Sequence, residues 1–158
     1  MVTASIKYEF SQRFRVPAAE AYAWCTDYSP QDHTLMGVKG KRKATHLTED
    51  TVILEDTIFS GGKAVQKRKL IRLDPGRLRY YNFHLTGPTR NSLYTYHIVP
   101  DGEGESMLEY TGYEVWYPRK APSKGQLAEI AKAEDASWRT EWGNLARAME
   151  RELRGKRS

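Results

Sequence analysis

Residues 122–154, with the sequence PSKGQLAEIAKAEDASWRTEWGNLARAMERELR, carry the longest regular pattern in the chain. At about 100° per residue, an α-helix over this range gathers its apolar side chains in one sector and most of its charged ones opposite. Trp138 and Trp142 lie one turn apart in the apolar sector, so the helix needs a wide apolar surface to pack on. The sector as a whole holds Leu127, Ile130, Ala131, Trp138, Trp142, Leu145, Met149 and Leu153.

A series of strands supplies that surface. Runs with strand-like character, separated by Gly and Pro turns, cover residues 6–14, 38–47, 51–59, 64–73, 78–86, 93–99 and 107–117. The short turns between consecutive runs predict antiparallel pairing. We therefore expect an α+β fold, with a curved seven-stranded antiparallel sheet wrapped around a long C-terminal helix. One or two short helices, at 18–26 and 30–36, follow the first strand, and a helix laid across such a sheet leaves a cavity between the layers.

Length and composition narrow the class of protein. A chain of 158 residues fits one domain, expected over 1–158. No apolar run reaches the roughly 18 residues of a membrane helix, and the N-terminus lacks the pattern of a signal peptide. The single cysteine, Cys25, excludes an internal disulfide and favours a cytoplasmic setting. The oligomeric state stays open between monomer and homodimer.

The order of elements resembles that of a known superfamily. Together with Phe14-Arg15-Val16-Pro17-Ala18-Ala19-Glu20-Ala21-Tyr22 leading to Asp27, it is similar to the START-like (SRPBCC) superfamily with the helix-grip fold. The polyketide cyclase/dehydratase and lipid-transport branch is the nearest match. The resemblance implies a seven-stranded sheet gripping the C-terminal helix, with a cavity for apolar or amphipathic ligands. Because members range from passive carriers to cyclases, it does not settle the function.

Strand alternation predicts which side chains face the helix. In the first strand they are Tyr8, Phe10 and Phe14, and in the strand at 93–99 they are Tyr94, Tyr96 and Ile98, with His97 outside. The register of the family implies Tyr80, Asn82 and His84 in the strand at 78–86, although Tyr81, Phe83 and Leu85 are the more apolar set. In the last strand it implies Glu109, Thr111, Tyr113 and Val115. The candidate ligand-binding residues are Tyr80, Asn82, His84, Tyr94, Tyr96, Thr111, Tyr113, Glu134, Trp138 and Trp142.

Several charged residues have alternative interpretations. Glu134 interrupts the apolar sector of the helix, where it is a rim residue, an ion-pair partner or a ligand contact. The run Lys39-Gly40-Lys41-Arg42-Lys43 is basic, and the net charge of the chain is +5. This basic cluster lacks the interleaved aromatic residues of a nucleic-acid site. We expect it to lie on solvated strand faces and turns, where charge reversal at Lys41 and Arg42 leaves stability nearly unchanged.

Three functions remain open. The leading one is a carrier or sensor that encloses a small hydrophobic or amphipathic molecule between sheet and helix. The alternative is a polyketide cyclase or dehydratase in which His84, Tyr96 or Glu134 would move protons. The third is binding to anionic surfaces or nucleic acid through Lys39, Lys41, Arg42 and Lys43. No metal or cofactor is expected, because the four histidines lack metal-site spacing and no phosphate- or dinucleotide-binding motif is present.

Overall fold

A computed structural model describes residues 1–156 of the chain. Within this range seven antiparallel strands form one sheet in the order β1-β7-β6-β5-β4-β3-β2. The strands are β1 (Ala4–Phe14), β2 (Gly40–Thr48), β3 (Thr51–Ser60), β4 (Lys63–Asp74), β5 (Arg79–His84), β6 (Leu93–Pro100) and β7 (Ser106–Trp116). The helices are α1 (Ala18–Cys25), α2 (Asp32–Leu35) and α3 (Lys124–Gly155). A 3-10 turn at Pro75–Arg77 precedes β5.

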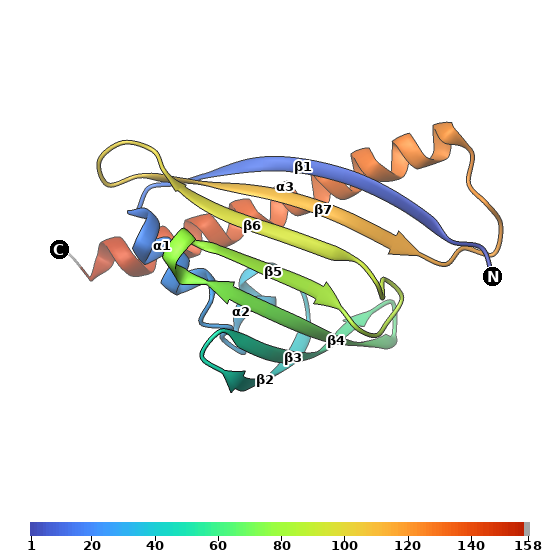
Figure 1. Cartoon of the computed structure of the whole chain (residues 1–158), viewed down its shortest axis with the longest axis horizontal. Coiled ribbons are helices and arrows are strands. Elements are labelled where there is room, and N and C mark those ends of the chain that lie inside the picture. The colour runs from blue at the N-terminus through green and yellow to red at the C-terminus, as the bar shows by residue number, and fades with distance from the viewer. Residues whose placement is uncertain (157–158) are drawn as a thin grey trace.

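The long helix α3 runs along one face of the sheet (Figure 1). Strands β1 and β7 follow its length, whereas β2, β3 and β4 curve away from it and leave a concave side between sheet and helix. This arrangement confirms the predicted α+β helix-grip fold. The expectation of one domain over 1–158 stays a prediction, and residues 157–158 lie outside the described part of the chain.

A capping box fixes the N-terminus of helix α3. The Ser123 side chain accepts a hydrogen bond from the backbone N–H of Gln126, and the Gln126 side chain accepts one from the backbone N–H of Ser123. The predicted span of 122–154 is therefore correct to within two residues. The C-terminal half of α3 is the part that packs most closely in the core. Its buried side chains are Trp142, Leu145, Ala146, Ala148 and Met149.

The direction of the side chains in β1, β5 and β6 agrees with the predicted alternation. Tyr8, Phe10 and Phe14 are buried in the core, as are Tyr94, Tyr96 and Ile98. In β5, Tyr80 and His84 are buried while Leu85, beyond the end of the strand, is exposed. The less apolar of the two possible sets of β5 therefore faces inward.

The predicted register of β7 is wrong by one residue. Directly opposite residues of paired strands share a face, and Tyr8 lies opposite Gly112 while Phe10 lies opposite Tyr110. The inward set of β7 is therefore Leu108, Tyr110, Gly112 and Glu114, and the expected set of Glu109, Thr111, Tyr113 and Val115 lies on the other face.

Gly112 explains why the pattern of β7 misleads. A Cβ atom at this position would lie only 2.7 Å from Cζ of Tyr8, because the Tyr8 ring crosses directly over the glycine. The inward face thus places a glycine and a buried carboxylate, Glu114, where an apolar residue is expected. Tyr113 and Val115, which are more apolar, occupy the outer face of the strand.

The segment between β1 and β2 closes the concave side. It contains α1 and the single turn α2, and it connects the two opposite edges of the sheet. We call residues 18–37 the arm. Tyr28 and Gly37 have positive φ angles of 50° and 81° and flank the α2 turn, so the backbone bends sharply on either side of α2.

Replacing Gly112 with alanine should destabilise the protein by about 1–3 kcal/mol, because the new methyl group displaces the buried Tyr8 ring. Gly143→Ala is the matched control: its Cβ would meet nothing closer than 3.6 Å, and alanine favours a helix interior by up to about 1 kcal/mol. Urea unfolding measures both changes. Equal free energies of unfolding for Gly112→Ala and the parent protein would contradict the packing of Tyr8 on this glycine.

Candidate functional site

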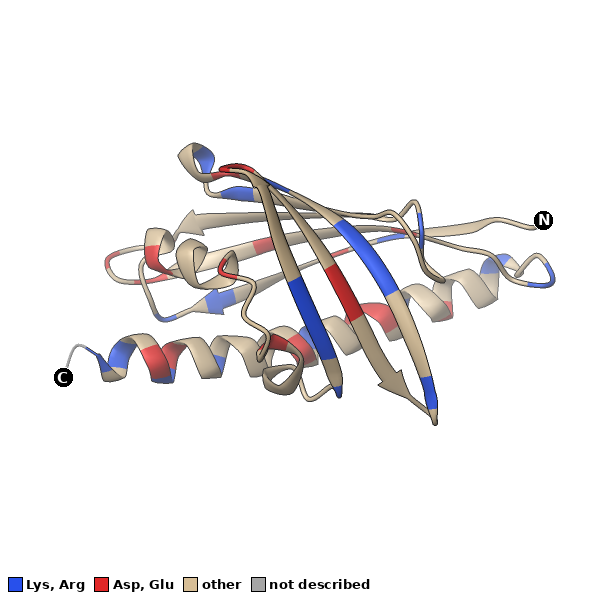
Figure 2. Cartoon of the chain, turned by 90° about the horizontal axis from the view of Figure 1, so that it is seen from below, with Lys and Arg blue, Asp and Glu red and all other residues tan. Residues whose placement is uncertain are grey.

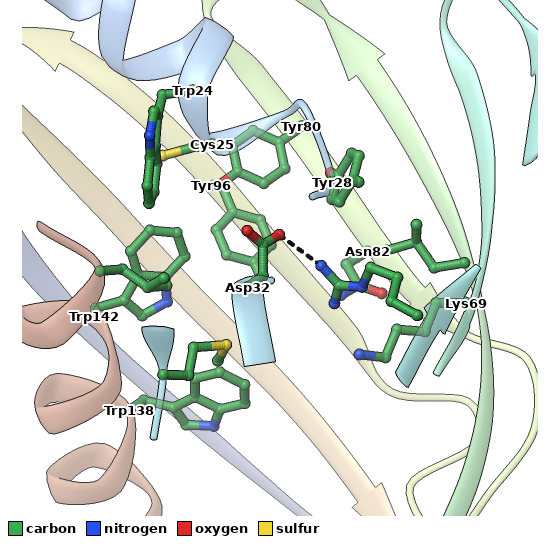
Figure 3. Close-up of a pocket in the computed structure, with 14 residues that line it drawn as sticks. Trp24, Cys25, Tyr28, Asp32, Lys69, Tyr80, Asn82, Tyr96, Trp138 and Trp142 are labelled. Carbon is green, nitrogen blue, oxygen red and sulfur yellow. Dashed lines mark hydrogen bonds and ion pairs between the residues drawn. The ribbon is translucent and has the colours of Figure 1, made fainter. Parts of the chain in front are cut away.

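A cavity of about 80 Å³ lies between the arm, α3 and the concave face of the sheet (Figure 3). An apolar cavity of about 150 Å³ accommodates benzene, so this one has room for only a few atoms as it stands. Its walls come from the arm, from α3 and from strands β2 to β6. The lining residues are Trp24, Cys25, Tyr28, Asp32, Met36, Arg42, Leu54, Lys69, Tyr80, Asn82, Tyr96, Trp138, Trp142 and Leu145.

Aromatic rings form one side of the cavity. Tyr80 and Tyr96 stack in parallel with ring centroids 4.3 Å apart. Trp142 lies against Tyr96 at 5.9 Å, which joins α3 to this stack. Trp138, one turn before Trp142, lies at the α3 side of the cavity (Figure 3). Flat, rigid rings of this kind offer a large contact area to an aromatic or apolar ligand.

Charged side chains form the other side. Asp56 is completely buried on the inward face of β3, and Arg42 of β2 donates two hydrogen bonds to it, of 2.8 and 3.0 Å. Lys69 of β4 lies 2.8 Å from the second oxygen of the same carboxylate. Bands of basic, acidic and basic residues therefore cross β2, β3 and β4 side by side (Figure 2).

The remaining contact of Arg42 reaches the arm. Its Nη1 donates a 2.8 Å hydrogen bond to the Asp32 carboxylate at the start of α2. His33, the next residue, is buried with Nε2 3.4 Å from Asp56. Gly40 makes room for the His33 ring, because a Cβ there would approach Cδ2 of the imidazole to 2.8 Å. The charged network thus connects α2 to three strands.

The two carboxylates of this network differ in their electrostatics. Burial alone would raise the pKa of Asp56, but the neighbouring His33, the hydrogen bonds from Arg42 and the charge of Lys69 outweigh it and hold the pKa well below its ordinary value. At Asp32 burial dominates and raises the pKa to about 6, despite the neighbouring Arg42. Burial also lowers the pKa of Lys69, while Asp56 opposes that effect. Asp56 is the firmly held acid, and Asp32 is the weakly held one.

Several residues that line the cavity have a buried polar atom without a well-formed hydrogen bond. Within residues 1–156 these atoms are the hydroxyls of Tyr28 and Tyr80, Oδ1 of Asn82 and Nε1 of Trp142. The Tyr80 hydroxyl faces the Cys25 thiol, which is a weak hydrogen-bonding group. Buried polar groups in native proteins almost always have partners, so four unpaired ones around a single cavity require an explanation.

Five of the ten predicted site residues line this cavity: Tyr80, Asn82, Tyr96, Trp138 and Trp142. Tyr94 and His84 lie beside it on the same face of the sheet, with ring centroids 4.8 Å apart. His84 is a poor candidate for proton transfer at neutral pH. Burial, together with Lys69 and Lys67, lowers its pKa to about 2, and its Nδ1 lies 2.8 Å from the Thr89 hydroxyl.

Glu134 belongs to a different group of residues. It lies near Glu114, a buried carboxylate that accepts hydrogen bonds from the hydroxyls of Tyr8 (3.3 Å) and Tyr94 (3.2 Å). Burial, and secondly the charge of Glu134, raise the pKa of Glu114. Glu134 is half-buried and is not part of the cavity wall. Within the described residues it forms no ion pair, so the ion-pair interpretation of this residue is wrong.

Two parts of the predicted site are incorrect. Thr111 and Tyr113 lie on the outer face of β7, and Tyr113 is 45% exposed. The basic cluster is divided between the two faces of β2: Lys43 reaches Glu55 on the outer face, whereas the Arg42 side chain is only 8% exposed on the inner face. Arg42 therefore has a buried structural contact, so the expectation that it lies on a solvated face is wrong, and charge reversal there should destabilise the protein.

The charged wall is the part of the site that sequence reasoning missed. Its signal was weak but present, because Asp56 continues the inward set of Val52 and Leu54 in β3. The partner of Asp56 could not be found from local sequence, since Arg42 lies on another strand and Lys69 on a third. Among residues 1–156 no group of three or more His, Cys, Asp and Glu side chains could hold a metal ion. No helix in this range is long and apolar enough to span a membrane.

Replacing Asp56 with asparagine should destabilise the protein by about 3–5 kcal/mol, because Arg42 and Lys69 would remain buried without their counter-charge. The neighbouring Glu55→Gln is the matched control, since this exposed residue pairs with Arg68 on the outer face at 3.0 Å and should contribute at most about 1 kcal/mol. The folded-state pKa of Asp56 lies below its unfolded value. Its stabilisation is therefore present above about pH 4 and is lost as the pH falls toward the folded value. Denaturant unfolding at pH 7 measures the free energy of unfolding of both variants. Similar decreases for Asp56→Asn and Glu55→Gln would contradict a special role of Asp56.

Neither a protein-family model nor a curated protein sequence matches the chain. Solved structures do match it. An aromatase/cyclase, Zhui, from Streptomyces superposes with a TM-score of 0.74 at 13% identity, covering 95% of this chain and 96% of that one. A START superfamily protein from Mycobacterium smegmatis gives 0.71 at 12% identity, with 92% and 97% coverage.

Norcoclaurine synthase from Thalictrum flavum, solved with dopamine and hydroxybenzaldehyde, gives a TM-score of 0.67 at 12% identity, with 92% and 87% coverage. At such low identities the likeness concerns the fold and not the activity. The chain therefore has the helix-grip fold of the START-like superfamily.

Proposed function

We propose that this protein binds a small amphipathic molecule, with an aromatic or apolar body and polar groups, in the cavity between the arm, α3 and the sheet. The observation that carries the proposal is that four residues lining one cavity, Tyr28, Tyr80, Asn82 and Trp142, each have a buried polar atom without a well-formed hydrogen bond. A purely apolar ligand would leave these atoms unpaired, which costs about 1–3 kcal/mol for each group. A ligand with matching polar groups would satisfy them.

The size of the cavity limits the ligand. About 80 Å³ is less than one aromatic ring requires, so part of the wall must move when a ligand enters. The arm is the suitable wall, because α2 is a single turn and sharp bends flank it at Tyr28 and Gly37. A long-chain lipid would need a far larger opening, which favours a compact aromatic molecule.

The role of a carrier or sensor requires only binding. The fold is shared with a cyclase, with a START superfamily protein and with an enzyme that was solved with dopamine and hydroxybenzaldehyde. These names are compatible with a small aromatic ligand here. The single cysteine favours a cytoplasmic setting, and a monomer or homodimer remains our expectation.

A cyclase or dehydratase is the second candidate, and one observation favours it. Asp32 and Lys69 both line the cavity, and each has a pKa moved toward neutrality by burial. Two such groups beside one ligand could act as general base and general acid. In this version they would take the place of His84, Tyr96 and Glu134, to which sequence reasoning assigned proton transfer.

The neutral phenol p-cresol is a suitable probe for the binding function, because it combines one aromatic ring with one hydroxyl. It should bind the purified protein in isothermal titration calorimetry. Trp142→Phe keeps a ring but removes the unpaired N–H, so affinity should fall about three- to tenfold, the value of one hydrogen bond. Trp116→Phe, on a half-buried tryptophan outside this cavity, is the control and should leave affinity unchanged.

Two results would contradict the proposal. One is the absence of binding by p-cresol and by the larger 2-naphthol at millimolar concentration. The other is an equal loss of affinity in Trp142→Phe and Trp116→Phe, which would place the bound phenol elsewhere on the protein.

A further inference from the structure

We propose that the Asp32 carboxylate is an internal substitute for an acidic group of the ligand, so that an aromatic carboxylate binds by replacing Asp32 on the guanidinium of Arg42. This inference rests on the proposed function, because it concerns the same cavity. It adds the chemical class of the ligand, the residue that recognises its acid, and the contact that the ligand must break.

The geometry of Arg42 allows a ligand carboxylate to replace Asp32 but not Asp56. Two of its hydrogen bonds go to Asp56, which is fully buried and also paired with Lys69. The third goes to Asp32 through a single donor, Nη1, at 2.8 Å. Figure 3 shows this contact inside the cavity, within the ring of aromatic and polar side chains. The donor that holds Asp32 therefore lies where a ligand carboxylate would need it.

Asp32 is also the acid that can leave. Its side chain retains 16% exposure whereas that of Asp56 has none, so a rotation about the Cα–Cβ bond can bring the Asp32 carboxylate to solvent. His33 can remain buried beside Asp56 during this rotation, which keeps α2 attached to the sheet. The departing carboxylate also vacates space in the cavity wall.

The charge balance requires an exchange and not an addition. The network contains two cations, Arg42 and Lys69, and two acids, Asp56 and Asp32. A ligand carboxylate added to this set would leave an excess negative charge in a buried site, which is costly. When the ligand replaces Asp32, the site stays neutral. Lys69, with N–H groups beyond the one directed at Asp56, can donate to the second ligand oxygen.

The other end of the ligand fits the opposite wall. The stacked rings of Tyr80 and Tyr96 and the indole of Trp142 lie across the cavity from the charged wall (Figure 3). An aromatic ring would pack there while its carboxylate reaches Arg42. A compact aromatic acid, with one ring and one carboxylate, matches both walls.

The exchange has a defined dependence on pH. The groups that act on Asp32 are Arg42 from β2, Asp56 from β3, His33 on α2, and Asp27 and Cys25 earlier in the arm. Burial raises the pKa of Asp32 to about 6, so below this pH it is protonated and holds Arg42 only weakly. Carboxylate binding should therefore strengthen as the pH falls through 6, until the ligand itself protonates near about pH 4.

Calorimetry with benzoate and with the neutral benzyl alcohol, at pH 7.5 and pH 5.5, tests the exchange. In the parent protein benzoate should bind about tenfold more tightly at pH 5.5, and benzyl alcohol about equally at both values. Asp32→Asn should bind benzoate about tenfold more tightly than the parent protein at pH 7.5, without the pH dependence. Asp27→Asn is the matched control in the same arm, because Asp27 is exposed and forms no ion pair within the described residues. It should keep the benzoate affinity of the parent protein at pH 7.5, and it should only move the pH dependence to lower pH, because the charge of Asp27 contributes to the raised pKa of Asp32.

The outcomes separate this inference from the proposed function. If benzyl alcohol binds but benzoate responds neither to pH nor to Asp32→Asn, the exchange is wrong and the binding function stands. If Asp27→Asn has the same effect as Asp32→Asn, general electrostatics explain the data and the exchange is wrong. If neither probe binds to any variant, both proposals fail. Should Asp32→Asn be unfolded, the pH dependence of the parent protein and the competition of benzoate with benzyl alcohol still decide the question.

Discussion

The buried carboxylate of Asp56 is the interaction on which the concave side of this protein depends. It lies on the middle one of three neighbouring strands, and Arg42 and Lys69 reach it from either side. A charge can remain in such a place only when it is paired and hydrogen-bonded, and here the pairing fixes the face on which all three side chains lie. The same contact orients the Arg42 guanidinium toward the arm, where Asp32 accepts its remaining bond. The position of α2 over the cavity follows from that bond and from the burial of His33 against Gly40.

The cavity is amphipathic because its two walls have different origins. The strands β2, β3 and β4 contribute the charged network, whereas β5, β6 and α3 contribute tyrosine and tryptophan rings. Neither wall alone indicates a ligand, since stacked tyrosines are common in antiparallel sheets and a buried ion pair can be purely structural. Their meeting around one small space, with several polar atoms left unpaired, is what favours a molecule with a ring and a polar group.

The errors of sequence reasoning have a common physical cause. In β1 and β6 the apolar pattern and the inward face coincide, so alternation was sufficient to predict Tyr8, Tyr94 and Tyr96 as buried. In β7 they diverge, because Gly112 must admit the ring of Tyr8 and Glu114 accepts hydrogen bonds from two tyrosines inside the core. In β2 the basic residues look alike, and only the neighbouring strand distinguishes Arg42, which faces Asp56, from Lys43, which faces Glu55.

The sequence by itself determined the order of elements, the long amphipathic helix, the antiparallel hairpins and most of the aromatic wall. These depend on local periodicity and on turns, which involve residues close together in the chain. Only the tertiary structure decided the face of β7, the pairing of Asp56 with Arg42 and Lys69, and the contact of Asp32 with the sheet. Each of these joins residues on different elements, and a shift of one position in strand register would place the same side chains on opposite faces. Local alternation can indicate the face of a residue such as Asp56, but it does not identify the partner on another strand, because that pairing is decided by packing and by the cost of burying an unpaired charge.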